Sequence, residues 1–372
     1  MTLIKSISGF RGTIGGRPGD TLNPVDIAKS VSAYAALREK KVSRNYRRKI
    51  VVGRDARMSG EMVMHVVSGT LMSMGFDVIN IGLASTPTTE IAVTLEKAVG
   101  GIIITASHNP RQWNALKFLD EKGEFLGPEE ASEVVRLANN CNFEFADVDT
   151  LGCYIKNFTY DQRHIEMVKD LELVDVEAIR RAHFNVAIDA VNSVGGVILP
   201  KLLGQLGVTQ VTGINTDPTG DFAHNPEPLK EHLSEIRNLM RKGRHDIGFV
   251  VDPDVDRLAV ICEDGSMFGE EYTLVSVADY VLRYTKGNTV SNLSSTRALN
   301  DVTVAHGGSY AAAAVGEVNV VTKMKETNAV IGGEGNGGVI YPESHYGRDA
   351  LVGIALFLSL MAEEKIKASE LR

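Results

Sequence analysis

The sequence contains few cysteines, and this scarcity excludes a disulfide-stabilised secreted domain. Cysteine occurs three times in 372 residues, at Cys141, Cys153 and Cys262, without the spacing of a zinc site or a redox motif. A small, odd number of cysteines is typical of a reducing compartment, where disulfides are rare. We therefore expect the three thiols to be packing residues of a cytoplasmic protein.

Long apolar segments and an excess of positive charge are also absent. The first ten residues, MTLIKSISGF, lack the apolar run of a signal peptide. The apolar run that starts at Leu351 is far shorter than the roughly 20 residues of a membrane span. The formal net charge of −8 argues against nucleic acid or an anionic membrane as the main partner. A local cluster of arginine and lysine can still bind a phosphorylated small molecule.

The composition that is present, 44% hydrophobic and 23% charged residues, is typical of a globular protein, and the length predicts two or three domains. Asn23 and Pro24 have the residue types of a helix start. Strand-like and helix-like segments then alternate, which predicts a mostly parallel sheet with helices on both faces. Strands are expected at 49–55, 76–82 and 101–105, and helices at 61–74 and 87–100.

Three later segments again end a buried strand in a loop rich in Asp, Glu, Gly or Ser, at 184–207, 245–265 and 328–341. This repetition suggests an α/β fold of three tandem related domains with mixed, mostly parallel sheets. In such sheets ligands bind at the carboxyl ends of the strands, so these loops are the candidate sites. A last helix is expected to start near Asp349 and to run almost to the C-terminus. The predicted domains are 1–153, 154–257 and 258–367, with 368–372 as the start of a further domain.

The motif DPDVDR brings three aspartates together at alternate positions. In an extended segment Asp252, Asp254 and Asp256 would point the same way, and three close carboxylates repel one another unless a divalent cation lies between them. Hard oxygen ligands suit Mg²⁺ or Ca²⁺. An EF-hand is excluded because Arg257 stands where its loop needs glycine and a strand-like LAVIC follows. A metal site is favoured over a simple acidic turn.

Two glycine-rich motifs offer polar side chains on permissive backbone. SGFRGTIGG places Arg11 among glycines that let amide groups approach an anion, although a flexible N-terminal loop has the same composition. GGEGNGG presents Glu334 and Asn336, which could hydrogen-bond sugar hydroxyls. A hairpin turn explains that motif equally well, and the strand-like residues after it argue against a dinucleotide-binding loop.

The motif GGIIITASHNP ends an apolar strand at Ser107. It lacks the glycines of a hydrolase nucleophile elbow, and His108 would usually point away from a serine that directly precedes it. A serine that caps a turn is the competing interpretation. A serine at a strand end, together with an arginine loop and a divalent-metal loop, favours phosphoryl transfer, where catalysis depends on positioning and charge stabilisation.

These loops, in this order, resemble the α-D-phosphohexomutase family of phosphoglucomutases, phosphomannomutases and phosphoglucosamine mutases. TASHNP resembles its phosphoserine loop, DPDVDR its Mg²⁺ loop, GEGNGG its sugar-recognition loop and SGFRG its arginine loop. The resemblance implies a phosphorylated Ser107 and Mg²⁺ held by the three aspartates and an oxygen of that phosphoserine. A hexose 1,6-bisphosphate would be the intermediate and, when added, the activator.

The resemblance also assigns roles to further residues. Arg11, Lys117 and His108 would lie on the catalytic side, with Arg11 and Lys117 assisting proton transfer. The substrate-binding residues would be Arg257, Lys323, Glu317, Glu334 and Asn336. The sequence departs from many relatives, which have Ser at position 336, His at 338 or His at 317. Substrate choice therefore stays open, with glucose or mannose phosphate expected ahead of glucosamine phosphate.

The family has a fourth, C-terminal domain with a loop that holds the non-reacting phosphate, whereas this sequence stops at Arg372. We accordingly expect a chain that folds and binds Mg²⁺ but turns over poorly, because the remote phosphate contacts are lost. We expect a monomer or homodimer that takes a sugar phosphate and neither nucleic acid nor membrane. Two alternatives are a non-catalytic sugar-phosphate-binding protein and a metal-dependent sugar phosphatase.

Overall fold

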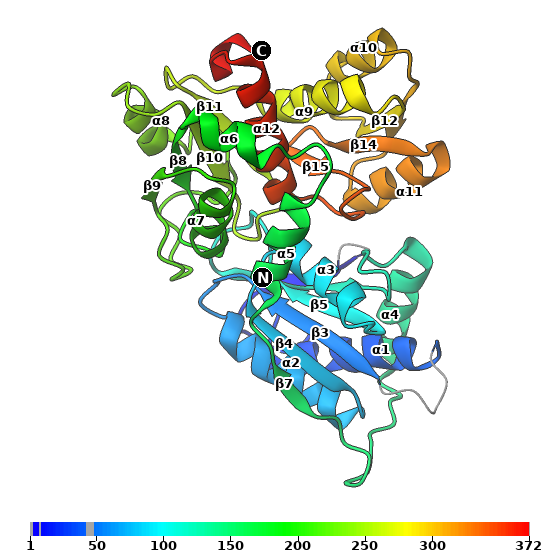
Figure 1. Cartoon of the computed structure of the whole chain (residues 1–372). Coiled ribbons are helices and arrows are strands. Elements are labelled where there is room, and N and C mark those ends of the chain that lie inside the picture. The colour runs from blue at the N-terminus through cyan, green and yellow to red at the C-terminus, as the bar shows by residue number, and fades with distance from the viewer. Residues whose placement is uncertain (1–2, 7–8, 42–47, 372) are drawn as a thin grey trace. The chain divides into compact units, whose positions relative to one another are not determined.

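The computed structural model describes residues 3–6, 9–41 and 48–371 (Figure 1). The chain divides into two compact units. Unit 1 comprises residues 1–161 with 219–221, and unit 2 comprises 162–218 with 222–372. None of the helices in the described ranges has the length and apolar character needed to cross a bilayer.

Unit 1 is built on one seven-stranded sheet with the strand order β1-β2-β6-β5-β3-β4-β7. The strands β5, β3, β4 and β7 pair in parallel, and β6, β2 and β1 extend the sheet in antiparallel fashion. The strands are β1 (Leu3–Ser6), β2 (Gly9–Thr13), β3 (Lys49–Arg54), β4 (Asp77–Leu83), β5 (Gly100–Ile104), β6 (Trp113–Leu119) and β7 (Tyr154–Lys156). The helices are α1 (Pro24–Glu39), α2 (Gly60–Ser73), α3 (Thr86–Leu95) and α4 (Pro128–Asn140), and α5 (Tyr160–Lys169) starts at the end of the unit.

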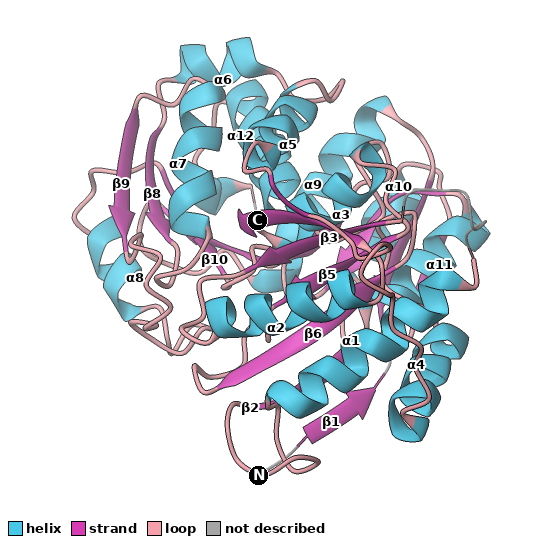
Figure 2. Ribbon diagram, turned by 90° about the horizontal axis from the view of Figure 1, so that it is seen from below, coloured by secondary structure: helices cyan, strands magenta, loops and turns pink. Residues whose placement is uncertain are grey.

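Helices cover both faces of this sheet, as the sequence predicted. Ile102 and Ile104 lie in a core formed with α1, α2 and α4, whereas Ile103 between them lies in a second core with α3. This alternation is that of a strand buried on both faces, and Figure 2 shows α1 and α2 along the sheet. The helix start at Asn23 is also confirmed, because the Asn23 side chain accepts hydrogen bonds from the backbone N–H groups of Val25 and Asp26.

Unit 2 contains two four-stranded sheets of equal topology, ordered β11-β10-β8-β9 and β13-β12-β14-β15. The first has β8 (Asn185–Asp189), β9 (Gln210–Ile214), β10 (Ile247–Val251) and β11 (Leu258–Cys262) with α6 (Val176–Ala182), α7 (Gly195–Gln205) and α8 (Ser234–Met240). The second has β12 (Asn288–Asn292), β13 (Tyr310–Ala313), β14 (Ala329–Glu334) and β15 (Gly338–Ile340) with α9 (Glu270–Tyr284), α10 (Ala298–Ala305) and α11 (Glu317–Thr327).

The same four-strand motif occurs in all three sheets. Three strands pair in parallel, and the third continues through a polar loop into an antiparallel fourth. The loop after the third strand is TASHNP between β5 and β6, DPDVDR between β10 and β11, and the GEGNGG turn between β14 and β15. The suspicion of tandem related α/β domains is therefore confirmed, and the three motifs occupy equivalent positions in the three repeats.

The long apolar helix α12 (Ala350–Glu364) contacts both β11 and β15 and so joins the two sheets of unit 2. Phe357 packs edge-on against Phe249 of β10 and against Phe268, with ring centroids 6.4 and 5.1 Å apart. The expectation that this helix runs almost to the C-terminus is wrong. It ends at Glu364 because Lys365 adopts a left-handed conformation (φ 58°), and a short 3-10 helix follows at Ala368–Glu370.

Candidate functional site

Ser107 lies in a tight turn directly after β5, with its backbone in the left-handed region (φ 46°). A non-glycine residue in that region is uncommon and needs support from its surroundings. The buried Arg57 supplies this support, because its guanidinium donates hydrogen bonds to the carbonyl oxygens of Ser107, Asn109, Pro110 and Trp113. One side chain therefore fixes the course of the whole serine loop.

Asp55 completes this support from the end of the neighbouring strand β3. Its carboxylate accepts hydrogen bonds from Arg57 Nε (3.1 Å) and from Thr105 Oγ1 (2.7 Å). Thr105 Oγ1 in turn accepts a hydrogen bond from the backbone N–H of Ser107 at 2.9 Å. Asp55 and Arg57 are not among the site residues predicted from the sequence. The available signal was the GRDAR segment that follows a predicted parallel strand beside the one that carries Ser107.

The expectation that His108 points away from Ser107 is wrong. In the left-handed turn successive side chains do not alternate as they do in a strand, and His108 Nδ1 lies 3.5 Å from Ser107 Oγ. Arg11 on β2 pairs with Ala115 of β6, so Arg11 and Lys117 project from the same face of the sheet. Arg11 Nε is buried and has no hydrogen-bond partner among the residues that the structure describes. Ser8 of the arginine motif lies outside those residues.

The three aspartates of DPDVDR converge in unit 2, but the local geometry differs from the predicted extended segment. The loop is a turn in which the Val255 N–H donates to the Asp252 carbonyl oxygen, with Val255 in the left-handed region (φ 61°). Oxygens of Asp252, Asp254 and Asp256 nevertheless lie within 4.8 Å of one another, and all three side chains are fully buried. The prediction of convergence is correct, although the turn and not strand alternation produces it.

This carboxylate cluster fits a divalent cation by its chemistry. Burial raises the pKa of Asp252 well above its ordinary value, and the neighbouring Asp256 and Asp254 raise it further. The ionised cluster is therefore costly unless positive charge is placed among the oxygens. All the donors are hard oxygens, as Mg²⁺ prefers. Asp252 Oδ1 also accepts hydrogen bonds from the backbone N–H groups of Asp256 and Arg257, which keeps the loop closed around the carboxylates.

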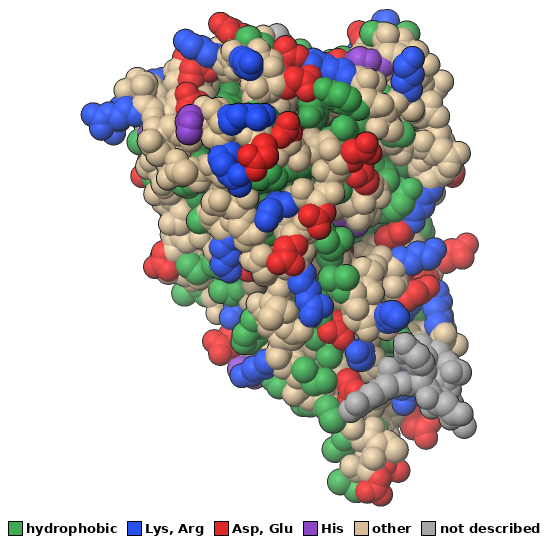
Figure 3. All heavy atoms as spheres, viewed as in Figure 1, with side chains coloured by type: hydrophobic (Ala, Val, Ile, Leu, Met, Phe, Trp, Pro, Cys, Tyr) green, Lys and Arg blue, Asp and Glu red, His purple; other side chains and the backbone are tan. Residues whose placement is uncertain are grey.

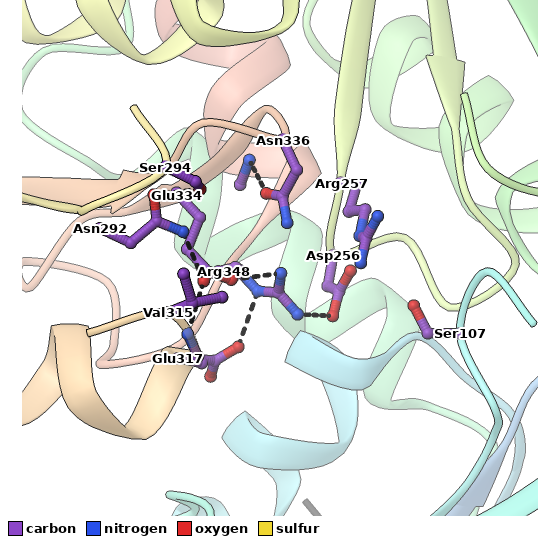
Figure 4. Close-up of polar contacts among 12 residues, drawn as sticks. Ser107, Asp256, Arg257, Asn292, Ser294, Val315, Glu317, Glu334, Asn336 and Arg348 are labelled. Atoms are coloured by element: carbon purple, nitrogen blue, oxygen red, sulfur yellow. Dashed lines mark hydrogen bonds and ion pairs between the residues drawn. The ribbon is translucent and has the colours of Figure 1, made fainter. Parts of the chain in front are cut away.

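Arg348, which is not among the predicted site residues, joins several of them in unit 2. Its buried guanidinium donates to Asp256 Oδ2 (2.6 Å), Glu334 Oε2 (2.6 Å) and Glu317 Oε2 (2.9 Å), as Figure 4 shows. It thereby connects the metal loop, the sugar-recognition loop and the first turn of α11. In the sequence Arg348 is a single arginine directly before the helix cap Asp349, and such an isolated arginine predicts no particular role.

Glu334 ends β14, and Asn336 lies in the hairpin turn that leads to β15, which is the competing interpretation given to GGEGNGG. The turn and the binding role are compatible, because the turn brings both side chains to the Arg348 cluster (Figure 4). Burial raises the pKa of Glu334, but Arg348, the Gly316 N–H and Asn292 outweigh it, and the pKa is lowered. Glu334 is therefore an ionised acceptor at neutral pH.

The other predicted substrate residues are placed unevenly. Glu317 is buried at the start of α11 and pairs with Arg348. Arg257 donates to Glu227 at 3.3 Å, and its buried Nε has no hydrogen-bond partner in the described part of the chain. Lys323 pairs with Glu326 of its own helix at 2.5 Å, and no contact in the described ranges joins it to the Arg348 cluster.

A second cluster of metal-ligating groups, formed by His164, His345 and Asp349, has a structural explanation. Asp349 Oδ1 caps α12 by accepting from the backbone N–H groups of Leu351 and Val352. Its other oxygen hydrogen-bonds both imidazole rings, at 2.8 Å to His164 and 3.2 Å to His345. These contacts anchor α5 to the start of α12, so the cluster serves helix packing.

Three comparisons relate the chain to known proteins. Models of phosphoglucomutase/phosphomannomutase alpha/beta/alpha domains I, II and III match residues 4–144, 162–265 and 269–372. A phosphoglucomutase/phosphomannomutase of Thermococcus kodakarensis is 36% identical over 324 residues, which is 87% of this chain and 70% of the relative. A phosphoglucosamine/phosphogalactosamine mutase of Sulfurisphaera tokodaii is 32% identical over 330 residues, 87% and 71% of the two chains. A structure of a phosphoglucomutase/phosphomannomutase family protein from Burkholderia thailandensis has a TM-score of 0.84 at 26% identity and covers 100% of this chain and 79% of its own.

Proposed function

The chain belongs to the phosphoglucomutase/phosphomannomutase family, and from that membership we propose that it interconverts hexose 1-phosphates and hexose 6-phosphates. The observation that carries the proposal is the placement of Ser107. The serine stands at the carboxyl end of a doubly buried strand, and Arg57 and Asp55 hold its backbone in a left-handed turn. A rigid backbone that presents a hydroxyl suits a group that repeatedly accepts and donates a phosphoryl group.

In the proposed reaction a phosphorylated Ser107 transfers its phosphoryl group to a hydroxyl of the bound hexose phosphate. The bond from phosphorus to Ser107 Oγ breaks and a bond from phosphorus to the sugar oxygen forms. The proton of the sugar hydroxyl passes to Ser107 Oγ, which becomes a hydroxyl group. The hexose 1,6-bisphosphate then returns its other phosphoryl group to Ser107. His108, whose Nδ1 lies 3.5 Å from Ser107 Oγ, is placed to hold the serine proton. Arg11 and Lys117 are the cationic residues proposed to assist this proton transfer.

Asp252, Asp254 and Asp256 would hold Mg²⁺. When bound, the ion supplies positive charge that offsets the negative charge of the transferring phosphoryl group. Arg257, whose Nε has no hydrogen-bond partner within residues 3–6, 9–41 and 48–371, is the proposed ligand of a substrate phosphate. Lys323, which pairs with Glu326, is a second candidate. Acidic and basic side chains are mixed on the described part of the face drawn in Figure 3.

The substrate is proposed to be glucose or mannose phosphate first and glucosamine phosphate next. Glu334 offers an acceptor for a sugar hydroxyl donor. The Asn336 Oδ1 accepts from the Gly338 N–H at 3.2 Å, so the Asn336 amide N–H₂ group points its donors elsewhere. One acceptor and one donor together suit two adjacent hydroxyl groups of a hexose.

Two measurements test the proposal. Intact-mass analysis of the purified chain should find one phosphoryl group, mapped to Ser107, that is lost on addition of a hexose phosphate. A panel of glucose, mannose and glucosamine 1-phosphates, with glucose 1,6-bisphosphate present, should then give the 6-phosphates. Release of inorganic phosphate without isomerisation would favour a sugar phosphatase. Binding without turnover and without phosphoserine would favour a sugar-phosphate-binding protein.

A further inference from the structure

Arg348 joins two loops that the proposed reaction uses for different purposes. Its Nη2 donates to Asp256 of the metal loop, its Nη1 to Glu334 of the sugar-recognition loop and its Nε to Glu317. In sequence Asp256 and Arg348 are 92 residues apart. Each of the three nitrogens contacts a carboxylate from a different element, so a displacement of the guanidinium towards one loop changes its contact with the others.

Arg348 also affects which oxygen of the Glu334 carboxylate can accept a hydrogen bond from a ligand. Glu334 Oε1 accepts two hydrogen bonds, from Asn292 Nδ2 (2.8 Å) and from the Gly316 N–H (3.0 Å). Because a carboxylate oxygen has two lone pairs, Oε1 is saturated. Among the residues that the structure describes, Oε2 accepts one bond, from Arg348, and so keeps a second lone pair. A sugar hydroxyl would therefore bind at Oε2, beside the hydrogen bond from Arg348 that Figure 4 draws.

Gly338 makes the space that Arg348 fills. A Cβ atom at position 338 would lie 2.4 Å from Arg348 Cδ and 3.0 Å from Arg348 Cγ. The backbone of Gly338 is not in the left-handed region, so alanine can adopt its conformation. A G338A variant would therefore displace the arginine stem while the guanidinium stays in the protein, which makes it a second way to perturb the same contacts.

We propose that Arg348 is a positioning residue that couples cation binding at the metal loop to hexose recognition at the sugar loop. A cation on the aspartates competes with Arg348 for the charge of Asp256. The guanidinium then interacts more strongly with Glu334 and Glu317 and fixes Oε2 for the sugar hydroxyl. Because such coupling is reciprocal, bound hexose should raise the affinity for the cation to the same extent. This inference rests on the proposed function.

The test measures the binding of glucose 1-phosphate by calorimetry, with and without millimolar Mg²⁺, and of Mg²⁺ by itself. All proteins carry S107A, so that no phosphoryl transfer intervenes. Inorganic phosphate, titrated in the same way, measures the part of the Mg²⁺ effect that comes from the phosphate group. We expect Mg²⁺ to tighten glucose 1-phosphate binding about fivefold to tenfold beyond its effect on inorganic phosphate.

Three variants resolve the role of the arginine. R348K keeps the positive charge but loses the several N–H donors of the guanidinium group. G338A keeps the arginine but displaces its side chain. R283K is the matched control. Arg283 also contacts three carboxylates, of Asp279, Glu363 and Glu364, on a solvent-exposed part of α9 and α12. The ratio to compare is the factor by which Mg²⁺ tightens glucose 1-phosphate binding, divided by the same factor for inorganic phosphate. We expect this ratio to fall to within about twofold of one in R348K and G338A and to be unchanged in R283K.

The outcomes separate this inference from the proposed function. A merely structural role would lower melting temperature and all affinities but leave the ratio intact, and an intact ratio in both R348K and G338A would overturn the coupling. If R348K does not fold, G338A decides. A parent protein that binds glucose 1-phosphate and Mg²⁺ independently also overturns the coupling while leaving the proposed function standing. A parent that binds neither overturns both.

Discussion

Two buried arginines, Arg57 in unit 1 and Arg348 in unit 2, organise the candidate residues of their own units in opposite ways. Arg57 donates mainly to backbone carbonyl oxygens and pairs with one carboxylate, Asp55. Arg348 donates to carboxylates alone, from Asp256, Glu317 and Glu334. Neutral carbonyl groups and one carboxylate surround the first arginine, whereas three carboxylates surround the second.

The difference determines what each region can respond to. Four of the acceptors around Arg57 are carbonyl oxygens, which do not titrate and carry no net charge, so the serine loop should respond little to a metal ion. Around Arg348 five buried carboxylates face one buried guanidinium and the partly buried Arg257; these carboxylates are Asp252, Asp254, Asp256, Glu317 and Glu334. This excess of negative charge leaves a place for a cation, so unit 2 should respond to metal and unit 1 should not.

The largest effect is expected for R57M. The substitution removes the arginine donor from four carbonyl oxygens of the serine loop and the cation from the buried Asp55 carboxylate. We expect a loss of about 5 kcal/mol of unfolding free energy, the upper end for breaking a buried ion pair. Denaturant unfolding measures it, and Mg²⁺ should not restore the loss. R111Q, which removes the exposed pair with Asp221, is the control and should cost less than about 1 kcal/mol.

R348M should have the next largest effect, about 3 kcal/mol, because it leaves three buried carboxylates without their cation. Here Mg²⁺ should restore part of the stability, since a cation that binds only the folded state stabilises it. Thermal melting with and without Mg²⁺ measures the difference. Equal responses of R57M and R348M to Mg²⁺ would contradict the contrast between the two arginines.

D252N should act in the opposite direction. Burial and the neighbouring aspartates raise the pKa of Asp252, so the ionised carboxylate destabilises the metal-free protein. Replacing it with the neutral amide should stabilise that form by about 1–2 kcal/mol and abolish the stabilisation by Mg²⁺. Melting curves in EDTA and in Mg²⁺ test both parts, with D217N on the surface as the control. Retention of a wild-type Mg²⁺ response in D252N would count against the metal site.

The smallest expected effect is a loss of unfolding free energy at acidic pH that depends on Asp349. Although burial raises the pKa of Asp349, His164 and His345 outweigh it, and the folded-state pKa lies below the ordinary value. An ionised Asp349 therefore stabilises the fold above about pH 4, the unfolded pKa, and this stabilisation is lost as the pH falls further. Unfolding free energies near pH 6 and pH 3 should differ more in the wild type than in D349N. The change in unfolding free energy between the two pH values should be larger in the wild type than in D349N by at least about 1 kcal/mol. An equal change in the two proteins would contradict the ion-pair assignment.

Local sequence was sufficient to predict the three loops and most of their side chains. Apolar strands that end in TASHNP, DPDVDR and GEGNGG are contiguous patterns, and the fold places all three after the third strand of a repeated motif. The details of conformation were less predictable. The aspartates converge through a turn with Val255 in the left-handed region, and His108 approaches Ser107 for a similar reason, because a tight turn cancels the alternation of side chains.

The sequence by itself determined the chemistry that the protein carries: a serine, a set of aspartates, a glutamate and an amide, each on a loop after a buried strand. Only the tertiary structure decided which arginines contact these loops. Arg57 and Arg348 are two among 39 basic residues, and a cation in a sequence gives no sign of its partners. Their roles arise because strand order brings Asp55 beside the serine loop and because α12 brings Arg348 to a turn 92 residues earlier. Burial then makes those contacts strong, and burial is a property of the folded chain.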